Sequence, residues 1–82
     1  MNSKEVVITL KDGLSPSSAC HFIQIANQFQ CQLHVEYDSH TVNAKSLLGL
    51  LALNVPYNRS IYLVADGVDE NEALEALTVF LT

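Results

Sequence analysis

Five of the seven residues from 47 to 53 are leucines, which is more leucine than a short helix can bury against one surface. At about 100° per residue these side chains cover about 220° of the helix circumference, whereas a helix lying on a sheet needs an apolar arc of little more than about 100°. Leu50 and Leu53 can face a sheet together. The remaining three, Leu47, Leu48 and Leu51, then form a second group that is at least partly exposed. Two interpretations stay open: tertiary contacts bury all five leucines, or the second group is a patch that binds a partner protein.

The first part of the chain predicts a strand followed by a helix. Residues 5–10 are rich in β-branched side chains and precede a turn signal at 11–13, which is typical of a strand. Ser15 before Pro16 is a strong helix start, because serine caps the first turn and proline fits the first helical position. We expect this helix to end near residue 27 or 28. Its apolar face has 3- and 4-residue spacing and comprises Ala19, Phe22, Ile23, Ala26 and Phe29.

The remaining elements complete an α+β pattern. Residues 33–37 and 41–43 predict two strands of a hairpin, and residues 60–65 predict another strand. Asp69 and Glu72 predict a capping box for a last helix, whose apolar stripe comprises Ala73, Leu74, Leu77, Phe80 and Leu81. The order β-α-β-β-α-β-α predicts a four-stranded antiparallel sheet with three helices on one face.

Length and charge limit the classes of function. Eighty-two residues suit one domain, residues 1–82. The first strand leaves no room for a signal peptide, and no apolar run approaches the roughly 20 residues that span a bilayer. We therefore expect a soluble, cytoplasmic protein without a membrane partner. The net charge of −5 argues against direct binding of nucleic acid, which needs clustered Lys and Arg.

Several groups that could carry chemistry have simpler interpretations. Five acids crowd near the last helix and indicate a helix start that suits negative charge: Asp66, Asp69, Glu70, Glu72 and Glu75. Cys20 and Cys31 form no CxxC motif, so we expect two reduced thiols, buried or half-buried. Cys20 and His21 are neighbours that point to different sides of a helix, so no metal site is expected. Ser15 lacks a G-x-S-x-G setting and His21 is nearly two helical turns away, which argues against a hydrolytic nucleophile.

Ser46 is the most informative single residue of the leucine segment. It is placed to cap the helix, a role worth about 1 kcal/mol that by itself explains a serine there. The same hydroxyl is a candidate phosphorylation site, because a phosphate would meet free N–H groups and the positive end of the helix dipole. It would place a dianion beside Lys45 and the second leucine group. That combination predicts a docking surface that phosphorylation switches.

Three sequence blocks carry a resemblance to a known family. They are DGL at 12–14, VNAKSLLGLLAL at 42–53 and ADGVDENEAL at 65–74, in this order and spacing. The chain resembles HPr, the histidine-containing phosphocarrier family of the bacterial sugar phosphotransferase system, over its whole length. It is especially similar to the catabolite-repression HPr-like paralogues of that family. The resemblance implies an open-faced β-sandwich, in agreement with the pattern of elements.

The resemblance also implies two phosphorylation sites. In the family, a histidine directly after the GL pair takes phosphate from enzyme I and passes it to sugar permeases; Ser15 stands at that position. The serine of the AKS motif is phosphorylated from ATP by HPr kinase/phosphorylase, and it is kept as Ser46 after Lys45. The seryl-phosphorylated form binds a LacI-type catabolite control regulator as a co-repressor. Leu47, Leu48 and Leu51 match the partner-facing positions of the docking helix.

Two departures from the family pattern change the expected activity. Phosphoimidazole transfers its phosphate readily whereas a serine phosphate ester is stable, so Ser15 does not replace the histidine as a carrier. None of the three histidines, His21, His34 and His40, is close enough along the chain to substitute. Ser17 replaces an arginine that in the family neutralises phosphate and lies near partner surfaces. The resemblance therefore implies recognition by the kinase more firmly than binding to the usual regulator.

The sequence as a whole predicts a regulatory HPr-like protein, not an enzyme, that needs no cofactor or metal. We expect phosphorylation at Ser46 by HPr kinase/phosphorylase and a role as co-repressor or partner-binding module in carbon catabolite regulation. Two alternatives stay open. One is an interaction or decoy domain that works without phosphorylation, and the other is a phosphocarrier that uses an unexpected residue.

Overall fold

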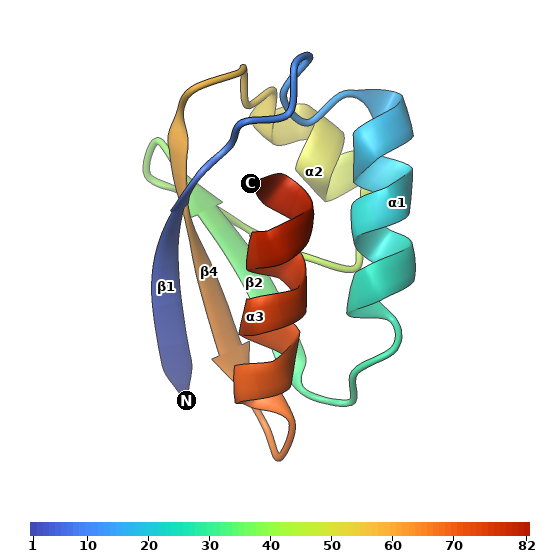
Figure 1. Ribbon diagram of the computed structural model, residues 1–82, viewed down its shortest axis with the longest axis vertical. Helices are drawn as coiled ribbons and strands as arrows, with labels where there is room; N and C mark the ends of the chain where they lie inside the picture. Colours follow the sequence, from blue (N-terminus) through green and yellow to red (C-terminus); the bar gives the residue numbers. More distant parts are fainter.

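Four antiparallel strands form one sheet in the order β1-β4-β2-β3, and three helices cover one of its faces (Figure 1). The computed structural model describes residues 1–82. The elements are β1 (Asn2–Val7), α1 (Pro16–Ala26), β2 (Gln32–Tyr37), β3 (His40–Asn43), α2 (Leu47–Leu53), β4 (Ser60–Asp66) and α3 (Glu70–Leu81). This order and this open-faced arrangement confirm the predicted α+β fold.

The core lies between the sheet and the helices, because alternate residues of the two central strands point toward the helices. Leu33 and Val35 of β2, with Ile61 and Leu63 of β4, are buried there. The helices add their predicted apolar faces, from which the buried members are Ala19, Phe22, Ala26, Leu50, Leu53, Ala73, Leu74, Leu77 and Leu81. These residues form one continuous hydrophobic cluster. None of the three helices combines the length and the apolar character that crossing a bilayer requires.

The first strand begins and ends about three residues earlier than the pattern predicts. The strand covers Asn2–Val7 rather than residues 5–10, because its pairing partner β4 begins at Ser60, which lies opposite Val7. Beyond that point Ile8 bonds to the loop that precedes β4: its N–H donates to the Arg59 carbonyl. The prediction was wrong because β-branched composition does not report where a partner strand starts.

Asp69 does not form the predicted capping box with Glu72. It occupies the N-cap position of α3, but its side chain makes no cap hydrogen bond. Its carboxylate instead accepts from the backbone N–H groups of Gln30 and Cys31, at 2.8 and 2.9 Å. The prediction failed because the fold brings two free donors from the loop before β2 within reach, and a carboxylate satisfies those two at once. Asp69 thereby joins the start of α3 to the start of β2.

Glu70, the next residue, makes the local side-chain contacts at the start of α3. Glu70 Oε1 accepts from the Gly67 N–H at 3.2 Å and pairs with the Met1 ammonium at 3.1 Å. Glu70 and Glu72 both lie in the first turn of α3, where negative charge suits the helix dipole. The predicted acidic helix start is therefore confirmed for Glu70 and Glu72, whereas Asp66 ends β4 and Asp69 makes a tertiary contact.

The Asp69 contacts give stability a defined pH dependence. The Gln30 N–H and, after it, the Cys31 N–H lower the pKa of Asp69 from its ordinary value of 3.8. A depressed carboxylate pKa contributes stability that is present above about pH 4 and lost as the pH falls through the folded-state value. We expect Asp69→Asn to lower the urea midpoint at pH 7 and to flatten the acid limb of the stability curve. Asp12→Asn, at an exposed turn acid, is the matched control; parallel curves for Asp69→Asn and the wild type would contradict this assignment.

Candidate functional site

Ser46 caps the short helix α2 at the end of the hairpin. Its backbone is extended (φ −106°, ψ 114°), and its Oγ accepts from the Gly49 N–H at 3.1 Å while its carbonyl accepts from the Leu50 N–H at 3.0 Å. The predicted cap is thus confirmed. The residue is half-buried and does not belong to the hydrophobic core, so part of it is accessible to solvent.

The chain reaches this cap through a tight turn after β3. Asn43 Oδ1 accepts from the Lys45 N–H at 2.8 Å, and the Asn43 carbonyl accepts from the Ser46 N–H at 3.0 Å. Between them, Ala44 is fully buried and donates its N–H to the Leu33 carbonyl. A Cβ at Gly49 would lie 3.1 Å from the Val42 Cβ, so the missing side chain lets α2 lie close against β3. The position of Ser46 is therefore fixed by contacts on both sides.

The five leucines of α2 divide into two groups. Leu50 and Leu53 are buried against the core. Leu48 keeps 81% of its surface exposed and Leu47 37%, while Leu51 is half-buried and packs against the edge of the core. The interpretation in which all five are buried is therefore wrong. We call Leu47, Leu48 and Leu51 the leucine surface; it begins at the residue that follows Ser46.

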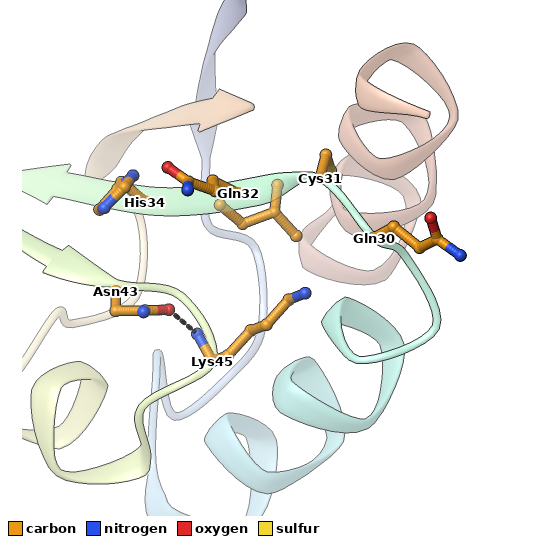
Figure 2. Close-up of a pocket in the computed structure, with 7 residues that line it drawn as sticks. Gln30, Cys31, Gln32, His34, Asn43 and Lys45 are labelled. Carbon is orange, nitrogen blue, oxygen red and sulfur yellow. Dashed lines mark hydrogen bonds between the residues drawn. The ribbon is translucent and has the colours of Figure 1, made fainter. Parts of the chain in front are cut away.

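Lys45 turns away from the leucine surface. Its ammonium donates to the Phe29 carbonyl at 2.8 Å, and its side chain extends toward the segment that joins α1 to β2 (Figure 2). Its alkyl chain lines a hollow with residues of β2 instead of packing beside Leu48. The structure therefore brings Ser46 and the leucines together, and it directs the neighbouring positive charge to a different part of the protein.

Ser15 caps α1 in a more enclosed hydrogen-bond network. Its Oγ accepts from the Ser18 N–H at 3.3 Å, and its own N–H donates to Ser18 Oγ at 2.9 Å, which makes a reciprocal capping box. Ser18 Oγ also donates to the carbonyl of Gly13 at 2.8 Å. The predicted helix start is confirmed. Both hydroxyl oxygen atoms of this pair already form hydrogen bonds with the backbone.

One histidine lines the same hollow as Ser15. His21 lines the same shallow hollow as Ser15, Ser17 and Ser18, and its ring meets Phe80 edge-on with 6.3 Å between the ring centres. The separation from Ser15 suggested otherwise, but His21 lies three and four residues after Ser18 and Ser17, on the same helix face. That spacing is the signal that could have found it. Lys11 is the basic residue of this hollow, and no arginine lines it.

The cysteines and histidines do not gather. No three His, Cys, Asp or Glu side chains lie close enough together to hold a metal ion. Cys31 is buried, and desolvation raises the pKa of its thiol. Cys20 is exposed, so the expectation of two buried or half-buried thiols was wrong for this residue. It follows the fully buried Ala19 by one residue, about 100° around the helix, which carries it off the apolar face.

The comparisons with known proteins decide the family. Residues 2–82 match the family model described as "PTS HPr component phosphorylation site". The chain belongs to the HPr family. Two curated relatives are named HPr-like protein Crh. The one from Halalkalibacterium halodurans is 42% identical over 99% of this chain and 96% of its own length, and the one from Bacillus subtilis is 41% identical over 99% and 95%.

Solved structures of the HPr family share the fold. The phosphocarrier protein HPr from Bacillus anthracis superposes with a TM-score of 0.96 at 38% identity, covering 99% of this chain and 96% of that chain. Crh from Bacillus subtilis, described as a swapped dimer, gives a TM-score of 0.79 at 41% identity, covering 99% and 93%. The relatives thus include a phosphocarrier protein HPr and the HPr-like protein Crh. The resemblance inferred from the sequence blocks is confirmed.

The two groups of leucines should differ sharply in their effect on stability. We expect Leu48→Ser to change the free energy of unfolding by no more than about 0.5 kcal/mol, because the side chain is exposed. Leu50→Ala, the buried control on the same helix, should cost about 2–5 kcal/mol. Urea unfolding measures both. A loss for Leu48→Ser as large as that for Leu50→Ala would contradict the exposed placement.

The hollow at Ser15 predicts the absence of carrier chemistry. Because a serine phosphate ester is stable and the ring of His21 meets Phe80 edge-on, incubation with enzyme I and labelled phosphoenolpyruvate should leave no acid-labile phosphate on the protein. His21→Ala is the discriminating variant. Acid-labile label on the wild type that disappears in His21→Ala would contradict the prediction and revive the carrier alternative.

Proposed function

We propose that this protein is a regulatory HPr-like module of the cytoplasm that is not a phosphoenolpyruvate-dependent phosphocarrier. HPr kinase/phosphorylase phosphorylates Ser46, and the modified protein acts as a co-repressor or partner-binding signal in carbon catabolite regulation. The observation that supports the proposal is that the half-buried Ser46 caps α2 directly before the leucine surface, in which Leu48 is largely exposed. The proposed activity is binding, with no catalytic residue and no cofactor.

A phosphate on Ser46 is compatible with the folded helix. The N–H groups of Leu47 and Leu48 have no backbone acceptor, and the Gly49 N–H already points at the Ser46 oxygen. Phosphorylation adds a charge of about −1.5 to −2 and strong acceptors, which the positive end of a helix dipole favours. The modification therefore changes the chemistry of the surface and leaves α2 folded.

The modified surface would present a dianion next to apolar side chains. A partner that recognises it needs basic groups for the phosphate and an apolar hollow for Leu47, Leu48 and Leu51. A LacI-type catabolite control regulator is the partner proposed, since the resemblance to the family implies it. Because Ser17 stands where the family has arginine, this interface depends mainly on α2. Lys45 is proposed to support it by holding the Ser46 segment in place through its bond to Phe29.

Incubation with ATP and HPr kinase tests the modification. We expect one phosphate per wild-type protein by mass spectrometry and none on Ser46→Ala. Ser15→Ala is the matched control, since Ser15 also caps a helix, and it should be phosphorylated like the wild type. No incorporation into the wild type would end the proposal.

A phosphorylation-independent interaction domain is the second candidate, and the exposure of Leu48 in the unmodified protein favours it. Pull-downs with the regulator separate the two. The main proposal expects capture by the seryl-phosphorylated protein, weak capture by the unmodified protein, and loss of capture when Leu48→Ser is added. Equal capture of both phosphorylation states would instead identify a constitutive binder or decoy.

A further inference from the structure

A second hollow lies on the other side of the Ser46 segment, between the start of β2 and the end of β3 (Figure 2). Its volume is about 300 Å³, at the lower end of the range for small-molecule sites. We call it the polar pocket; its lining residues are Gln30, Cys31, Gln32, Leu33, His34, Asn43 and Lys45. It shares no residue with the leucine surface.

The charge in the polar pocket is positive and unbalanced. No carboxylate lines it, although the protein as a whole carries a net charge of −5. The ammonium of Lys45 donates to the neutral Phe29 carbonyl, and the ion pairs of this structure both involve the Met1 ammonium instead. Lys45 is half-buried, and no carboxylate forms an ion pair with its ammonium. Such a group favours an anion as its partner.

The rest of the lining offers unused hydrogen-bonding groups. Asn43 Oδ1 accepts a hydrogen bond from the Lys45 N–H, which leaves the Asn43 Nδ2 free to donate. Gln32 and His34 also line the pocket and add further donors and acceptors, whereas the Gln30 side chain points away from Lys45 (Figure 2). Amide groups around one cation suit a ligand that combines an anionic group with hydroxyl groups.

One carboxylate approaches the pocket from α3. Asp69 lies behind the backbone of Gln30 and Cys31 and accepts both of their N–H groups. Its oxygens therefore face bonded donors, and it does not line the hollow itself. This arrangement leaves Lys45 available to an incoming anion.

We propose that the polar pocket binds a small hydroxylated anion, either a phosphomonoester or a carboxylate. Its anionic group replaces the Phe29 carbonyl as the partner of the Lys45 ammonium, and the amides of Gln32 and Asn43 bind its hydroxyl groups. Because Lys45 directly precedes Ser46, the bound ligand acts on the segment that carries the modification site. The proposal does not require that Ser46 be phosphorylated.

Titration of the unphosphorylated protein, followed by amide chemical shifts, tests the pocket with three probes of similar size. We expect saturable shifts, centred on residues 30–34 and 43–45, with glycerol 3-phosphate, with glycerate, or with both, and none with neutral glycerol. Which of the two anions binds shows whether the pocket takes a phosphomonoester or a carboxylate. No saturable shift with either anion, or equal shifts with glycerol, would overturn the proposal.

Two variants test the residues. Lys45→Gln should weaken binding at least tenfold, whereas Lys11→Gln, which changes the lysine in the hollow beside Ser15, should leave it unchanged. Gln32→Glu keeps Lys45 and its bond to Phe29 but places a carboxylate at an exposed position of the lining, so it should abolish binding while the thermal unfolding midpoint stays close to that of the wild type. Undiminished binding to Gln32→Glu would contradict the site. Phosphorylation by the kinase plays no part in these measurements, so their failure would leave the proposed function intact.

Discussion

The packing of α2 by only two of its five leucines is the constraint on which the rest of the account depends. Seven residues make a helix of two turns, and burial of Leu50 and Leu53 orients it against the core. Close approach to β3 is possible because Gly49 has no side chain to meet Val42. Once that orientation is set, the direction of the other leucines follows from helix geometry. Their exposure is thus a consequence of the packing of Leu50 and Leu53, and it removes no side chain from the core.

The two capping serines show how similar local chemistry supports different roles. Ser15 and Ser18 bond reciprocally, and the Gly13 carbonyl completes the network, so the oxygens at that position are committed to the backbone. Ser46 has a single cap bond, to the Gly49 N–H, and lies before a helix whose first N–H groups are free. A new anionic group is therefore accommodated more readily at Ser46. The two capping residues are thus both serines, and what distinguishes them is their hydrogen bonding.

Local signals predicted most of the fold. Ser15 before Pro16, the alternation through Leu33 and Val35, and the leucine spacing in α2 each report short-range preferences that the tertiary structure keeps. The errors concern contacts between distant segments. Asp69 was predicted to be a local cap because the sequence does not reveal that the N–H groups of Gln30 and Cys31 come within hydrogen-bonding distance of its carboxylate. The limits of β1 depended in the same way on the start of β4.

In the candidate site, too, local features could be predicted from the sequence and contacts between distant segments could not. The cap by Ser46 and the division of the leucines into two groups could be predicted from helix geometry. The exposure of the second group depends on tertiary packing, and the direction of the Lys45 side chain depends on the Phe29 carbonyl of another segment. The central claim is that charge added at Ser46 alters the surface and leaves α2 in place. Amide hydrogen exchange at Leu50, whose N–H bonds to the Ser46 carbonyl, tests it most directly. The account predicts equal or greater protection in the seryl-phosphorylated protein than in the unmodified one, and loss of protection through α2 on phosphorylation would contradict it.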